Sequence, residues 1–143
     1  MATIYHDFNI RAEQSAVFEL LSTAAGLDHW WTQHCSGKSQ LGSTFELSFG
    51  EGYVWTALVT KLIPDQEFEL TMIKADSDWE GTRIGFQIEQ GPGSVIIRFS
   101  HQGWPAENQH YRLSSYCWAM YLRLAKRFLE KGERFPFENR LSA

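Results

Sequence analysis

The fold is decided by residues 94–132, which read SVIIRFSHQGWPAENQHYRLSSYCWAMYLRLAKRFLEKG. One face of the first part is apolar with a period of two, as in a half-buried strand, and Gly103-Trp104-Pro105 ends it. A period of three and four residues then predicts a helix from Asn108 to Lys131, with Gly132 as its left-handed cap. The inward stripe of this helix is expected to consist of Leu113, Cys117, Met120, Leu124 and Phe128. A strand followed by a long amphipathic helix therefore closes the chain.

Upstream of this segment, residues 42–102 also keep a period of two. Turns at Gly50-Glu51-Gly52, Pro64-Asp65 and Gly91-Pro92-Gly93 divide the region into consecutive antiparallel strands, of which 53–63 and 67–74 are two. Residues 4–10 alternate as well and predict a first strand. Helical spacing over 12–22 places Glu13 in a first turn, and Gly26 is expected to break this helix before a short second one.

The expected order is thus a strand, a helix pair, five or six antiparallel strands and a long helix. The apolar face of such a sheet must be covered, and only the last helix is long enough to cover it. The sequence therefore predicts an α+β fold in which a curved antiparallel sheet of about six strands wraps the C-terminal helix. The whole chain, 1–143, is expected to form one domain.

Composition narrows the function classes. The formal net charge is −4, and lysine and arginine residues do not cluster, so a nucleic-acid partner is not expected. The sequence contains no run of about 18 apolar residues, so membrane insertion is not expected. The start of the chain does not resemble a signal peptide, so a cytoplasmic protein is expected. Cys35 and Cys117 lack metal-ligand spacing and are expected to be reduced thiols.

The chain has six tryptophans, and several of them lie beside turns or at the ends of apolar runs, which suits the walls of a cavity. Trp55, Trp79, Trp104 and Trp118 are expected to include two or three such walls, and Tyr53, Tyr116 and Tyr121 could add hydroxyls. Trp30 and Trp31 are adjacent, so a regular element would send one inward and the other to the cavity or the surface. The alternative is that both only pack the short helix onto the sheet.

His101 lies in phase with the apolar face of its strand, near the strand end. It could hold a polar ligand atom at a cavity mouth, or be a buried histidine bonded to the backbone of Gly103 or Trp104. No nucleophile and base pair or carboxylate pair is convincing, and His29, His34 and Cys35 do not have zinc spacing. The sequence therefore predicts no catalytic residue, no metal and no cofactor.

Four stretches carry a resemblance to a known family. They are VFELL at 17–21, Trp30-Trp31, RFSHQGW at 98–104, and the terminal helix with the Gly and Pro that follow it. They resemble the helix-grip superfamily of START-related lipid-transfer domains, pollen-allergen-type binders and polyketide cyclases. Within it, residues 3–136 are similar to the family named for the activator of heat-shock-protein ATPase homologues. The resemblance implies a cavity between the sheet and the C-terminal helix.

These observations lead to one main hypothesis, a non-catalytic binder of a small apolar or aromatic molecule. Its ligand-binding residues are predicted to be Trp30, Trp31, Phe49, Trp55, Phe86, His101, Trp104, Cys117, Met120 and Tyr121. A cyclase or hydrolase with His101 as general base and a tyrosine as acid is the first alternative. The second is a module that contacts a chaperone or another protein through exposed Trp79 or Trp104. Exposed edge strands would also permit a homodimer.

Overall fold

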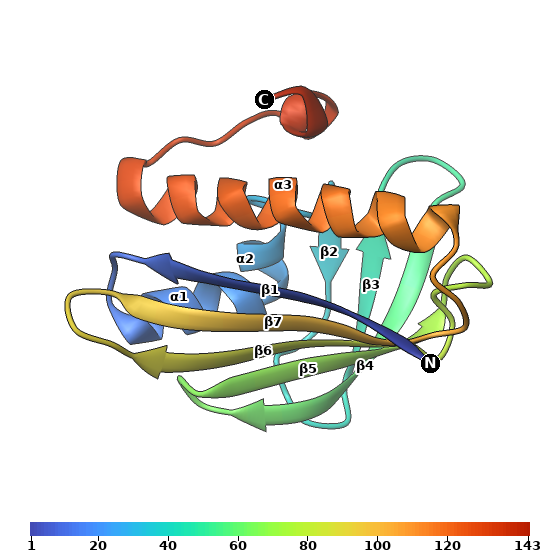
Figure 1. The fold of residues 1–143 in the computed structure, drawn as a ribbon, viewed down its shortest axis with the longest axis horizontal. Coiled ribbons are helices and arrows are strands. Elements are labelled where there is room, and N and C mark those ends of the chain that lie inside the picture. Colours follow the sequence, from blue (N-terminus) through green and yellow to red (C-terminus); the bar gives the residue numbers. More distant parts are fainter.

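The computed structural model describes residues 1–143 as an antiparallel sheet with three α-helices and a C-terminal 3-10 helix (Figure 1). The elements in chain order are β1 (Ala2–Ile10), α1 (Gln14–Ser22), α2 (Ala24–Leu27), β2 (His34–Ser36), β3 (Thr44–Ser48), β4 (Val54–Ile63), β5 (Glu67–Lys74), β6 (Arg83–Gln90), β7 (Val95–Trp104), α3 (Gln109–Lys131) and η1 (Phe137–Ser142).

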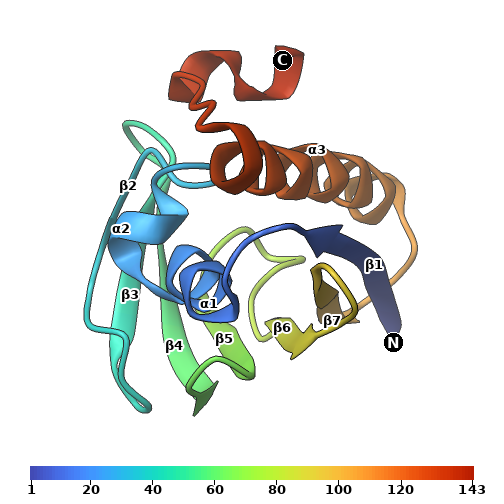
Figure 2. The ribbon, with the colours of Figure 1, turned by 90° about the vertical axis from the view of Figure 1, so that its left-hand side faces the viewer.

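The seven strands are ordered β1-β7-β6-β5-β4-β3-β2, so the first strand joins the last and β1 and β2 form the two edges. Figure 2 shows the sheet curving around α1, with α3 across its open side. The predicted α+β helix-grip architecture is confirmed, with one strand more than the six expected. The additional strand is β2, whose three residues are too few to show a period.

The alternation of β7 places Val95, Ile97, Phe99 and His101 inside, as predicted. These residues belong to, or adjoin, one cluster of 28 buried apolar residues between the sheet and the helices. The period of two is a reliable signal here because one side of the sheet is covered and the other faces solvent. The curved sheet therefore presents a continuous apolar surface to α3.

The predicted inward stripe of α3 is largely wrong. The buried residues of this helix are Ser114, Trp118, Leu122, Leu124 and Ala125. Only Leu124 belongs to both sets, and Leu113 is 57% exposed. Leu113 and Cys117 face a cavity instead of the core. Their apolar side chains therefore do not indicate that this side of the helix packs against the sheet.

The helix pair also differs from the prediction at two residues. Glu13 has extended backbone and precedes α1 as its N-cap, so it does not lie in the first turn. The break between the helices occurs at Thr23, whose side chain accepts a hydrogen bond from the Gly26 backbone N–H at 3.0 Å. Gly26 lies inside α2, where a Cβ atom would be 2.5 Å from the carbonyl oxygens of Glu19 and Leu20. The glycine therefore permits close packing of α2 on α1.

The end of α3 follows the prediction, since Gly132 has a left-handed backbone with φ 68°. Beyond it, η1 lies on the side of α3 away from the sheet (Figure 1). Arg140 anchors this segment, because its buried guanidinium donates to the carbonyl oxygens of Thr32, Asp28 and Phe135. None of the helices is long and apolar enough to cross a bilayer.

Candidate ligand-binding site

A cavity of about 390 Å³ lies under the first half of α3. Its walls come from the segment after α2, the β3–β4 turn, strand β4, the β5–β6 connection and the helix. The lining residues are Trp31, Phe49, Tyr53, Trp55, Asp76, Trp79, His110, Leu113, Ser114, Cys117, Trp118 and Tyr121. Small-molecule sites commonly measure about 300 to 1,000 Å³ and are mostly apolar, so both size and lining suit a small ligand.

Five aromatic rings form the floor and one wall of the cavity, and we call them the five-ring circuit. The ring centroids are separated by 5.4 Å for Trp31–Phe49, 5.1 Å for Phe49–Trp55, 5.0 Å for Trp55–Trp79, 5.8 Å for Trp79–Trp118 and 4.9 Å for Trp118–Trp31. Each ring thus contacts the next, and the last contacts the first. Aromatic pairs at such distances stabilise one another by about 0.5–1.5 kcal/mol beyond the area they bury, so the circuit is a preorganised surface.

Burial within the five-ring circuit is uneven. Trp31, Trp79 and Trp118 are at most 7% exposed and form the floor, whereas Phe49 and Trp55 are half-buried and form the wall. Leu113 and Tyr53 are more than half exposed at the rim. The cavity is therefore open to solvent on the side of the rim and closed by packed indoles below.

Polar groups gather at one side of the mouth. His110 Nδ1 lies 3.2 Å from the Asp78 carboxylate oxygen Oδ2, in the connection that also carries Asp76. Asp76 is exposed, and its backbone carbonyl accepts hydrogen bonds from the N–H groups of Trp79 and Glu80. These bonds fix the turn that holds Trp79 against the helix.

His101 lies behind the floor and orients it. The Trp118 indole Nε1 donates to His101 Nδ1 at 3.1 Å, so the imidazole proton is on Nε2, which donates to Thr82 Oγ1 at 2.8 Å. The Thr82 hydroxyl in turn donates to the carbonyl oxygen of Trp79. Burial, followed by the proximity of His110, lowers the pKa of His101 to about 3. A neutral imidazole therefore links two members of the five-ring circuit.

The sequence left two interpretations of His101 open, a contact with a ligand or a buried histidine bonded to loop backbone. The structure agrees with burial but not with a backbone partner. Its partners are the side chains of Thr82 and Trp118, and the residue is fully buried. With both ring nitrogens engaged and no contact with the cavity, His101 is not placed to act as a general base on a molecule bound there.

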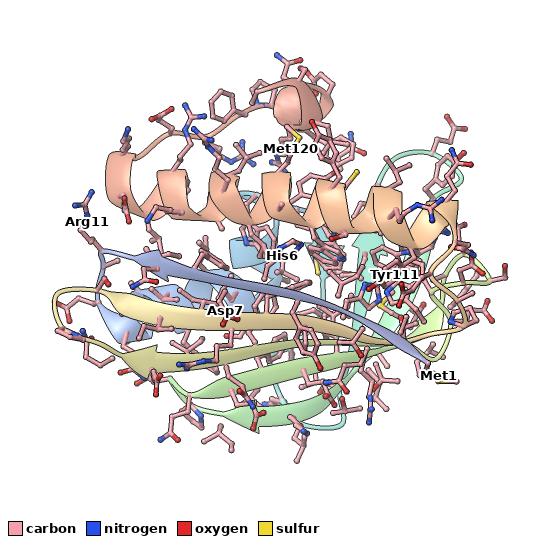
Figure 3. All side chains as sticks on the ribbon, viewed as in Figure 1. Met1, His6, Asp7, Arg11, Tyr111 and Met120 are labelled. Atoms are coloured by element: carbon pink, nitrogen blue, oxygen red, sulfur yellow. The ribbon has the colours of Figure 1, made fainter.

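Half of the predicted binding residues line the cavity. These are Trp31, Phe49, Trp55, Cys117 and Tyr121. Trp30, Phe86, His101 and Trp104 belong to the packed interior beside it, at 2% exposure or less. Met120 is half-buried on the side of α3 away from the sheet (Figure 3). Ligand binding by any of the ten stays a prediction.

The tryptophans are more buried than the sequence suggested. Trp30 and Trp31 are 0% and 3% exposed, so neither lies at the surface. Trp30 is part of the core and Trp31 lines the cavity, which is one of the two arrangements that the sequence suggested. They lie in an irregular turn after α2, where adjacent side chains need not diverge as they do in a strand. Trp79 and Trp104 are 7% and 0% exposed and so offer no protein-binding surface of the kind expected.

Sequence reasoning missed Asp76, His110, Leu113 and Ser114 as lining residues. Asp76 stands in a polar loop whose pattern indicates solvent exposure, and only the docking of α3 brings it beside the aromatic rings. Of the four tryptophans considered as walls, Trp55, Trp79 and Trp118 do line the cavity, and so do Tyr53 and Tyr121.

Both cysteines are free thiols with little nucleophilic character. Burial raises the pKa of Cys35 to about 12 and also raises the pKa of Cys117, so both are protonated near neutral pH. In the cavity, the Cys117 side chain therefore acts as a small apolar wall.

Comparison with known proteins agrees with this architecture. The sequence profile of the family described as Activator of Hsp90 ATPase homolog 1-like protein matches residues 11–130. The chain belongs to this family. The Aha1 dimer from Colwellia psychrerythraea, solved in solution, is 30% identical over 93% of this chain and 99% of its own, with a TM-score of 0.83. The search of curated proteins found no match.

More distant members of the fold extend the comparison. Protein SSP2350 from Staphylococcus saprophyticus is 17% identical over 94% of this chain and 96% of its own, with a TM-score of 0.79. CalU16 from Micromonospora echinospora is 12% identical over 98% of this chain and 81% of its own, with a TM-score of 0.76. At these identities the likeness concerns the fold alone.

Proposed function

We propose that this protein binds a small hydrophobic or aromatic molecule in the cavity between the sheet and α3, without transforming it chemically. The observation that supports the proposal is the five-ring circuit, which leaves an apolar space of about 390 Å³ open at one side. Burial of apolar surface contributes about 25 cal/mol per Å², offset by the freedom lost on binding. Affinity in the micromolar range therefore requires no ion pair.

Isothermal titration with a panel of lipids, flavonoids and polyketides tests this proposal. Cys117 lines the cavity, so Cys117→Phe should fill part of it and weaken binding about tenfold. Ala119 is exposed on the same helix and outside the cavity, so Ala119→Phe is the matched control and should leave affinity unchanged. Flat titrations across the panel, or equal effects of the two variants, would count against a ligand in this cavity.

The alternatives fit the geometry less well. An enzyme with His101 as general base would need this residue to reach the cavity, and a module that uses Trp79 or Trp104 would need them at the surface. A chaperone contact would have to use a different surface.

We also propose that the chain forms a homodimer. Its relative from Colwellia psychrerythraea is described as a dimer, and the edges β1 and β2 have no partner strand on their outer sides. Native mass spectrometry of the freshly purified protein would report assembly and any co-purifying ligand together.

A further inference from the structure

The charged side chains around the cavity are mostly acidic. Asp76 is the only acidic residue among the lining side chains, and none of them is a lysine or an arginine. Its carboxylate makes no ion pair within the chain. His110, the one lining side chain that can become a cation, already faces the carboxylate of Asp78 at 3.2 Å. Acidic groups therefore exceed basic groups at the mouth, on a chain whose net charge is −4.

The aromatic walls of the cavity also favour a positively charged group over a negative one. Four members of the five-ring circuit are indoles, and Tyr53 and Tyr121 add two phenol rings. The face of an aromatic ring carries negative electrostatic potential and attracts a cation, most strongly for tryptophan. Several rings that surround one space, with a carboxylate at the opening, form the kind of surroundings that hold an ammonium group.

An anionic ligand would find little complementary charge in this cavity. Two of the four lining indole N–H groups are out of its reach. The Trp118 Nε1 is engaged by His101, and the Trp79 Nε1 is fully buried without a hydrogen-bond partner. A carboxylate or phosphate would also lie beside Asp76 with no lysine or arginine to offset the repulsion.

We propose that the cavity selects a positively charged ligand, an organic ammonium with an aromatic or branched alkyl part. The inference rests on the proposed function, because it names the chemical class of the molecule held there. The aromatic rings would contact the alkylated nitrogen, and the Asp76 carboxylate would balance its charge at the solvent side.

A pair of probes of nearly equal shape tests the proposal. Phenyltrimethylammonium and tert-butylbenzene differ in one central atom, nitrogen or carbon, and hence in charge. In an apolar cavity without cation recognition, tert-butylbenzene would bind more tightly because the ammonium loses its hydration. We expect isothermal titration to show that phenyltrimethylammonium binds at least as tightly, since cation–π contacts can strengthen binding about fivefold or more.

Three variants locate the preference. Asp76→Asn should weaken phenyltrimethylammonium about twofold to fivefold and leave tert-butylbenzene unchanged, whereas Glu80→Gln, an exposed acid outside the cavity on the same connection, should change neither. Trp55 is half-buried in the wall, so Trp55→Leu can be made without emptying the core. It should weaken the ammonium about fivefold more than the neutral probe.

The outcomes separate this proposal from the proposed function. Tighter binding of tert-butylbenzene, or unchanged ammonium binding in Asp76→Asn, would overturn the ammonium preference while a binding cavity remained. If neither probe bound but neutral members of the ligand panel did, the preference alone would fail. If nothing bound, both proposals would fail.

A final arm identifies the source of the ammonium. Phosphatidylcholine vesicles present the same trimethylammonium group on a lipid headgroup. Displacement of phenyltrimethylammonium by these vesicles would support the site with a lipid as its source. Displacement by soluble choline alone would support it with a free ammonium compound as its source.

Discussion

At the scale of single residues, His101 shows how a polar group can be an interior structural element. The strand period predicts that this residue points inward, and it does so with no exposure to solvent. Its two ring nitrogens then serve different purposes, one accepting from Trp118 and one donating to Thr82. The imidazole satisfies an indole N–H that would otherwise be buried without a partner, which would cost about 1–3 kcal/mol.

This arrangement predicts that acid destabilises the protein. The folded-state pKa of His101, about 3, lies below the unfolded value of 6.5, so the unfolded chain binds the proton more readily between these limits. The contribution to stability is complete above about pH 6.5 and is lost as the pH falls toward 3. The free energy of unfolding, measured with urea, should fall by about 2 kcal/mol between pH 7 and pH 5 through this residue.

The control for this prediction is His101→Gln, which keeps a donor and an acceptor but does not titrate. Burial also lowers the pKa of His29, so a smaller decline of the same sign should remain in the variant. A variant as pH-dependent as the parent over pH 5–7 would show that His101 is not the group responsible.

At the scale of elements, the strands could be predicted from sequence and the orientation of α3 could not. The alternation along β7 reports which side is covered, because Val95, Ile97, Phe99 and His101 are buried and the residues between them are more exposed. The helix faces two apolar surroundings instead, the core and the cavity. Leu113 was expected to be buried but is exposed at the cavity rim, whereas Ser114 is buried. In the sequence, an apolar side chain at the rim of a cavity cannot be distinguished from one in the core.

The contact between α1 and α2 carries a prediction of its own. A methyl group on Gly26 would meet two backbone carbonyl oxygens at 2.5 Å, and backbone does not move aside easily. We therefore expect Gly26→Ala to lower the free energy of unfolding by about 2 kcal/mol or more, measured by urea denaturation. Because Trp30 and Trp31 lie in the turn that follows α2, the variant should also change the intrinsic fluorescence.

Gly85→Ala provides the comparison for Gly26→Ala. Gly85 lies in β6, and a Cβ atom there would be 3.4 Å from the Ser100 hydroxyl, an ordinary contact. The same chemical change should be neutral or slightly stabilising at this position. Similar losses at the two glycines would show that close packing of α2 on α1 is not the reason for the glycine.

At the scale of the whole molecule, the aromatic residues divide between two tasks. Trp30, Phe86 and Trp104 fill the interior, whereas the five-ring circuit both packs against that interior and borders the cavity. The sequence indicates many large rings beside turns, a placement that suits the walls of a cavity. It does not indicate which rings border it, because this depends on the distance between α3 and a sheet formed by distant segments.

Arg140 connects the C-terminal segment to the turn that carries Trp31. Its guanidinium donates to the carbonyl oxygens of Asp28 and Thr32, which lie on either side of Trp31 in the chain. Arg140→Leu should leave these buried acceptors unpaired and lower the free energy of unfolding by about 3 kcal/mol. Hydrogen exchange should rise in residues 28–32 together with residues 133–143, since one side chain connects them. Arg134 also donates to Asp28 but is exposed, so Arg134→Leu should have little effect on either segment. Unchanged exchange of residues 28–32 in Arg140→Leu would mean that the turn carrying Trp31 holds its shape without the C-terminal segment.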